Sequence, residues 1–165
     1  MASRIIRPHM PSTITPAGHR KIVDEYDWLI LRERPHITAE VGRAAAHGDR
    51  SENSEYIYGK QRLREIDRRL RFLKGRIEVL QVVDPRDFSG ERVFFGASVE
   101  VEDPDGNAQT WTIRGEDEVD LDNRVVSYAS PIGKALIGRS VGDDVSFQTP
   151  GGKRELTILA VSFPR

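Results

Sequence analysis

Residues 54–80 have the sequence SEYIYGKQRLREIDRRLRFLKGRIEVL, and the spacing of their apolar positions determines the expected architecture of the first half of the chain. The spacing between these positions alternates between three and four residues without interruption, and Gly59 is the one member that is not a large apolar residue. The positions are Tyr56, Gly59, Leu63, Ile66, Leu70, Leu73, Ile77 and Leu80. A repeat of 3.5 residues is typical of a left-handed coiled coil. This segment therefore predicts a long helix that packs along one seam against a second helix.

The partner helix is expected to precede it. Thr15-Pro16 is a typical helix start, and Gly48 is a typical stop after the last periodic residue. Between them runs a helical stripe of Ile22, Tyr26, Leu29, Ile30, Ile37, Val41, Ala44 and Ala45. Pro35 interrupts the stripe. Because proline lacks an N–H group and crowds the preceding turn, we expect a kink or a short break there.

A short polar link, 49–53, joins the two helices, and such a link favours an antiparallel hairpin. We assign residues 14–82 to a coiled-coil hairpin with an acidic tip at 48–55. Residues 1–13 show no apolar period and are assigned to a loose N-terminal tail.

The second half, 83–165, is expected to form a small antiparallel β-sheet domain with a short helix, so the fold class is α+β. Runs rich in Val, Phe, Thr and Trp predict strands at 93–101, 109–113, 124–128, 145–148 and 155–161. Turn residues at 103–107 and 150–152 predict two hairpins. A short helix is expected at 131–137, with Gly138 ending it.

Composition and charge narrow the function. The 165 residues contain no cysteine, no export signal and no apolar run long enough to span a membrane, so we expect a cytoplasmic protein with no membrane partner. Residues 1–80 hold 16 Lys and Arg against 11 Asp and Glu, whereas residues 81–165 hold 9 against 15. The two halves are therefore suited to different partners.

The basic run from Lys60 to Arg76 is unusual, because eight Lys and Arg face only two acids. A solvated coiled-coil flank normally mixes charges of both signs. The excess favours contact with a polyanion over a merely solvated face. The candidate residues lie on two flanks of the helix and are Lys60, Arg62, Arg64, Arg68, Arg69 and Arg71.

The acidic tip, with Asp49, Glu52 and Glu55, has two interpretations. In the simpler one, these acids and Asn53 serve the turn and the positive end of the second helix. In the other, Asp49 and Glu52 present oxygen ligands for Mg²⁺ to a site in another macromolecule. The chain has no nucleotide-binding glycine loop, no histidine spacing for a metal and no evident Ser-His-Asp set, so we do not expect an enzyme in its own right.

The tip string Gly48-Asp49-Arg50-Ser51-Glu52-Asn53-Ser54-Glu55-Tyr56 resembles the signature of the Gre family of bacterial transcript cleavage factors, most closely its GreB branch. The C-terminal half is similar to the same family at 95–97, 130–138, 141–143 and 149–152. The resemblance covers residues 13–163 and favours the functional interpretation of the tip.

The resemblance implies a mechanism. The hairpin would enter the secondary channel of bacterial RNA polymerase, where Asp49 and Glu52, which match the family's functional acids, would help to hold a second Mg²⁺. Glu55 and Asn53 would support them. The polymerase would then cleave its own transcript. No cofactor is expected to bind the chain tightly, because the Mg²⁺ is shared with RNA polymerase only in the complex.

The resemblance also assigns partners to the remaining residues. The basic patch would grip the 3′ end of backtracked nascent RNA, and Ser130 and Pro131 would dock on the polymerase at the channel rim. The C-terminal domain would be similar to FK506-binding proteins, and we expect a monomer. Two alternatives stay open: a Gre-like polymerase inhibitor, and a prolyl isomerase with a helical arm. The isomerase would use the aromatic residues Trp111, Phe94, Phe95 and Tyr128.

Overall fold

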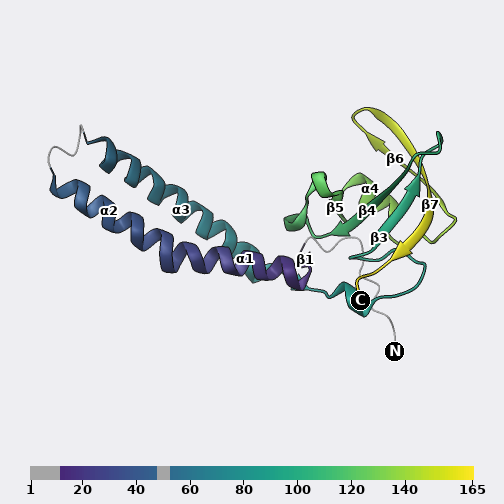
Figure 1. The fold of residues 1–165 in the computed structure, drawn as a ribbon, viewed down its shortest axis with the longest axis horizontal. Coiled ribbons are helices and arrows are strands. Elements are labelled where there is room, and N and C mark those ends of the chain that lie inside the picture. The colour runs from purple at the N-terminus through teal and green to yellow at the C-terminus, as the bar shows by residue number, and fades with distance from the viewer. Residues whose placement is uncertain (1–11, 48–52) are drawn as a thin grey trace. The chain divides into compact units, whose positions relative to one another are not determined.

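The computed structural model describes residues 12–47 and 53–165 (Figure 1). Its contacts divide the chain into two compact units. One is the helical segment His19–Val79, and the other joins Leu80–Arg165 to the residues up to Gly18. None of the helices within the described ranges has the length and hydropathy that a membrane span requires.

The helical unit is an antiparallel hairpin (Figure 1). The first arm comprises α1 (Pro16–Trp28), whose first turn up to Gly18 belongs to the other unit, the π-helix η1 (Leu29–Glu33) and α2 (Arg34–Ala46). The second arm is α3 (Ser54–Val79). The predicted start at Thr15-Pro16 is confirmed, since the Thr15 hydroxyl accepts a hydrogen bond from the Gly18 N–H at 3.1 Å. The seam is confirmed as well: the buried residues of α3 are Gly59, Ile66 and Leu73.

The helices approach closely at Gly59, where an added Cβ would lie 2.5 Å from Cγ2 of Val41. Any larger residue at this seam position would push α3 away from α2. The glycine that is off type in the heptad pattern is therefore the residue that lets the two arms meet near the tip.

The irregularity expected at Pro35 takes the form of the π-helix, and the helix is not interrupted. The Arg34 N–H bonds to the Leu29 carbonyl, one residue further back than in an α-helix. The buried hydrophobic residues of the first arm are Ile22, Leu29, Ile37 and Ala44. Their spacing is seven, eight and seven residues, whereas Gly59, Ile66 and Leu73 are seven apart. The wider π turn absorbs the extra residue and keeps the stripe facing α3.

The second unit contains a five-stranded sheet in the order β5-β4-β3-β7-β6 (Figure 1). Its strands are β3 (Ser98–Glu102), β4 (Ala108–Arg114), β5 (Val125–Ser127), β6 (Asp144–Thr149) and β7 (Gly152–Ser162). Helix α4 (Pro131–Leu136) buries Leu136 completely in the core, and Gly138 follows it with a φ of +84°. The hairpins β3–β4 and β6–β7 confirm both predicted turns. The first strand is shorter than expected, because Gly96 has a φ of +88°.

The expectation of a wholly antiparallel sheet is wrong at one edge. Strand β5 pairs with β4 in parallel, with Thr112 opposite Val125 and Arg114 opposite Ser127. Parallel neighbours require a crossover connection, because a tight turn can join only antiparallel strands. The link 115–124 supplies the crossover and contains two short 3₁₀ helices, η3 (Glu116–Glu118) and η4 (Leu121–Asn123).

A second parallel pair joins the two ends of the hairpin sequence. Strand β1 (Thr13–Ile14) lies beside β2 (Gln81–Val82), and Ile14 is fully buried. Thr13, which we assigned to the loose tail, therefore belongs to a strand. The rest of that tail, 1–11, lies outside the described residues.

Candidate functional site

The two acids predicted to act at the tip, Asp49 and Glu52, lie outside the described residues. The supporting residue Asn53 has a defined role. Its Nδ2 donates to the Ala44 carbonyl at 2.8 Å, and its Oδ1 accepts from the Tyr56 N–H at 3.2 Å. Asn53 thus caps α3 and at the same time ties its first turn to the last turn of α2. Glu55 is exposed in the first turn of α3.

Two of the predicted basic residues are held by acids within the hairpin. Arg69 makes a two-pronged contact with Glu25, at 2.7 Å from Nε to Oε1 and 2.9 Å from Nη2 to Oε2. The hydrogen bond from Arg69 holds the pKa of the Glu25 carboxyl below its ordinary value. Arg62 lies 3.3 Å from Glu33 and 3.4 Å from Glu65. The charges of both arginines are therefore largely compensated.

A third pair crosses between the arms in the opposite direction, from Arg34 on α2 to Asp67 on α3, at 2.8 Å. The hydrogen bond from Arg34 lowers the pKa of Asp67, and the nearby charge of Arg71 adds to that effect. Each cross-helix pair joins residues that flank the seam. Together they fix the register of one arm against the other.

The other predicted basic residues form what we call the outer basic face: Lys60, Arg64, Arg68 and Arg71. All four are exposed. Within 12–47 and 53–165, none of them has a hydrogen-bond or ion-pair partner at contact distance. Steps of four, four and three residues place them along one side of the helix, away from the buried seam. They form a positive strip without direct ion pairs in the described part of the chain, although the charge of Arg71 acts at longer range on Asp67.

In the sheet unit, the predicted docking residue Ser130 organises the start of α4. Its Oγ donates to the Ser127 carbonyl at 2.6 Å and accepts from the Gly133 N–H at 3.1 Å. Pro131 follows as the first, exposed residue of the helix. Ser130 also lines a cavity of about 750 Å³, whose apolar walls include Trp111 and Phe147.

The four aromatic residues considered for an isomerase pocket do not converge. Only Trp111 lines the cavity. Phe95 and Tyr128 are buried in the core with ring centroids 5.9 Å apart, while Phe94 stacks on Phe88 at 5.7 Å. Phe147, which does line the cavity, was missed in the sequence, although the alternation of β6 marks it as a partly buried position.

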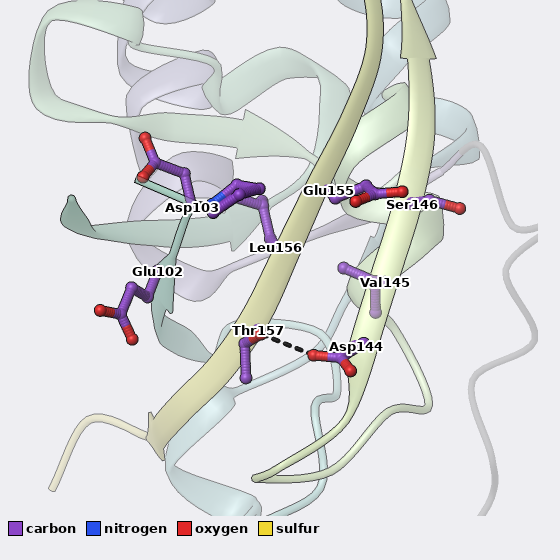
Figure 2. Close-up of a pocket in the computed structure, with 9 residues that line it drawn as sticks. Glu102, Asp103, Asp144, Val145, Ser146, Glu155, Leu156 and Thr157 are labelled. Carbon is purple, nitrogen blue, oxygen red and sulfur yellow. Dashed lines mark hydrogen bonds between the residues drawn. The ribbon is translucent and has the colours of Figure 1, made fainter. Parts of the chain in front are cut away.

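A second groove of about 440 Å³ lies beside strands β3, β6 and β7 and is strongly acidic (Figure 2). Its carboxylates do not gather at one point: Asp144 accepts a hydrogen bond from Thr157, while the side chain of Glu102 points elsewhere (Figure 2). No cluster of three or more potential metal ligands occurs in the part of the chain that the structure describes. The groove gives the sheet unit a negative surface, which disfavours contact with nucleic acid.

Comparison with known families covers both units. The family model described as "Transcription elongation factor, N-terminal" matches residues 12–82, and the one described as "Transcription elongation factor, GreA/GreB, C-term" matches residues 89–163. The chain belongs to the GreA/GreB family of transcription elongation factors. Membership confirms the resemblance found in the tip and glycine motifs, and the chain is a transcription elongation factor of this family.

Relatives in the family align over most of their length. Transcription elongation factor GreB of Haemophilus ducreyi is 49% identical over 85% of this chain and 86% of its own. That of Neisseria meningitidis serogroup B is 47% identical over 91% and 93%. A solved structure, GreA factor homolog 1 (Gfh1) of Thermus thermophilus, is 27% identical over 92% and 98%, with a TM-score of 0.42.

Proposed function

We propose that this elongation factor binds bacterial RNA polymerase and stimulates the polymerase's own cleavage of backtracked nascent RNA. The observation that carries the proposal is the outer basic face, because four cations that form no direct ion pair within the described residues follow an acidic tip in the sequence. A positive strip attracts the phosphates of a single strand, and Asp49 and Glu52, which precede the strip in the sequence, would act at the phosphodiester bond that is cut.

At the tip, Asp49 and Glu52 would supply oxygen ligands to a second Mg²⁺ held mainly by the polymerase. Mg²⁺ requires near-octahedral oxygen coordination, so two carboxylates on one short segment would hold it weakly without further ligands. Two-metal hydrolysis uses one ion at the attacking oxygen and one at the leaving oxygen. The factor would therefore contribute to the reaction without being the enzyme.

The two units would divide the remaining work. The hairpin would enter the secondary channel, and Lys60, Arg64, Arg68 and Arg71 would contact the extruded RNA 3′ end. The sheet unit, as a domain similar to FK506-binding proteins, would dock at the channel rim through Ser130 and Pro131. The apolar cavity beside Ser130 supports docking on a protein. The scattered aromatic residues speak against an isomerase, which a peptide isomerisation assay would test.

The deciding experiment compares RNA cleavage in stalled, backtracked polymerase complexes with the parent and with Asp49→Ala/Glu52→Ala. We expect the double variant to bind the polymerase while cleavage falls toward the polymerase's intrinsic rate. Raising Mg²⁺ should partly restore intrinsic cleavage, because the lost quantity is metal occupancy. Loss of favourable charge at the helix end should cost only about 0.3–1 kcal/mol of stability.

Glu78→Ala is the matched control, because it removes an exposed acid from the other end of α3. It should leave cleavage unchanged. If the double variant still bound the polymerase and cleaved as fast as the parent, the tip acids would be capping residues and the cleavage role would be wrong. A Gre-like inhibitor would differ from the outset, since the parent itself would slow cleavage.

A further inference from the structure

The carboxylate of Glu118 binds the segment that begins the first helix of the hairpin. Its Oε2 accepts hydrogen bonds from the Thr15 N–H at 3.1 Å and from the Gly115 N–H at 3.0 Å. Its Oε1 accepts a third from the Thr15 hydroxyl. Thr15 and Glu118 are 103 residues apart in the sequence. One half-buried side chain thus fastens two distant segments of the chain.

Two glycines allow the close approach at this contact. A Cβ at Gly18 would lie 2.3 Å from Oε1 of Glu118, and one at Gly115 would lie 2.2 Å from the Thr13 carbonyl oxygen. Thr15 is 6% exposed, and its hydroxyl caps α1 by accepting from the Gly18 N–H. Glu118 therefore binds Thr15, which in turn caps the first turn of α1. The helix dipole also favours a negative charge at this end of the helix.

The same stretch of chain leads from Glu118 to the proposed docking segment. After η3 and η4 the chain enters β5, whose last residue is Ser127. The Ser127 carbonyl accepts from both the N–H and the hydroxyl of Ser130. A Cβ at Gly133 would lie 2.2 Å from that carbonyl oxygen, so α4 is seated directly on it. Close contacts thus connect Ser130, through β5 and η3, to the start of α1.

We propose that Glu118 is a positioning residue for cleavage: it holds Thr15 and the first turn of α1 against η3, at the point where the chain enters the hairpin that carries the tip acids. The inference rests on the proposed function, and it adds a residue remote from both tip and docking segment. Loss of this contact would leave the docking residues and the tip acids unchanged, but the start of the hairpin would no longer be held, and cleavage by the bound factor should fall.

The test separates binding from delivery by titrating the factor against backtracked polymerase. Glu118→Ala should lower the cleavage rate at saturating factor by about tenfold or more, since small misplacement of reacting groups costs factors of this order. The concentration for half-maximal effect should stay within about twofold, because the docking residues are untouched. Glu118→Gln should recover most of the rate, because its carboxamide oxygen can accept both N–H bonds and its NH₂ can donate to the Thr15 hydroxyl.

Glu116→Ala is the control, since it removes an exposed acid from the same 3₁₀ helix. It should behave as the parent in both measurements. If Glu118→Ala reaches the parent's saturating rate, or if it changes only the half-maximal concentration, the positioning role is overturned. If Glu118→Ala does not fold, Thr15→Val takes its place: a reduced saturating rate supports the proposal, and a parental one overturns it.

Hydrogen exchange gives a readout that needs no polymerase. The Gly18 amide should exchange faster in Glu118→Ala than in the parent, and at the parental rate in Glu116→Ala. Unchanged exchange at Gly18 would overturn the fastening itself. A parent that fails to stimulate cleavage would instead overturn the proposed function, so the two failures are distinguishable.

Discussion

Arginines lie on two sides of α3, but only those on one side pair with carboxylates of the first arm. Arg62 and Arg69 lie beside the seam and each meets a carboxylate from the first arm. Arg64 and Arg68 lie on the outer basic face and, within the described residues, meet none. The difference is one of angular position alone, because a residue next to the seam lies within reach of the other helix.

The comparison shows that a run of like charges on one helix can serve two different roles. The paired arginines use their charge to hold the register of the hairpin. The cations of the outer basic face, which are unpaired within the described residues, have charges that are available for contact with a partner. A contact with RNA should accordingly be confined to one side of the helix, and three experiments can break or sharpen this division.

The largest effect is expected on the outer face. Arg64→Ala/Arg68→Ala/Arg71→Ala should reduce cleavage of deeply backtracked complexes about tenfold, with a smaller loss on shallow ones, whose extruded RNA is shorter. With three phosphate contacts removed, the salt dependence of action on deep complexes should become shallower by about two logarithmic units per decade of salt. Equal losses on both substrates would mean that this face serves polymerase docking and not RNA.

The matched variant on the other side is Arg62→Ala/Arg69→Ala. We expect cleavage within about twofold of the parent, and a stability loss of about 0.2–1 kcal/mol per pair, since both pairs are partly exposed. Urea unfolding measures the loss. If this double variant were as stable as the parent but lost as much cleavage as the triple variant, the two sides of α3 would not differ in function.

The smallest effect is a pH dependence. The folded-state pKa values of Glu25 and Asp67 lie below their ordinary values because of Arg69 and Arg34. The unfolded chain therefore binds protons first as the pH falls, so these pairs stabilise the fold above the ordinary carboxyl pKa and lose that effect below it. Glu25→Gln should thus be less stable than the parent at pH 7, with the gap closing toward pH 3. A gap that does not change with pH would exclude the ion pair as its cause.

Local periodicity was enough to predict the hairpin. Its seam follows from Leu63, Ile66, Leu70 and Leu73, because a heptad repeat has few other ways to bury its apolar side. The two β-hairpins could also be predicted, since each contains its own turn residues. The direction of β5 could not be predicted, because the alternation of a strand is the same whether its neighbour runs parallel or antiparallel.

The site was predictable only in part, for a related reason. A basic run indicates a charged side, but it does not say which arginine a carboxylate from another helix will reach. Asn53 could be named from its place before α3, yet its bond to Ala44 depends on the return of the chain. The role of Glu118 could not be predicted from the sequence, because its partner Thr15 is remote in sequence. Asp49 and Glu52 stay a prediction.

The π turn at Leu29–Glu33 has a consequence for how the length of the hairpin can change. A single residue added to or removed from an α-helix rotates everything beyond it by about 100°. Here the first arm holds one residue more than an uninterrupted heptad would allow between Leu29 and Ile37, and the turn takes up that rotation in place. Removing one residue from 30–36 would restore seven-residue spacing along the whole arm, whereas a deletion within 38–43 would turn Ala44 out of the seam. The hairpin thus has one segment in which its sequence length can change by one residue while the buried seam is kept.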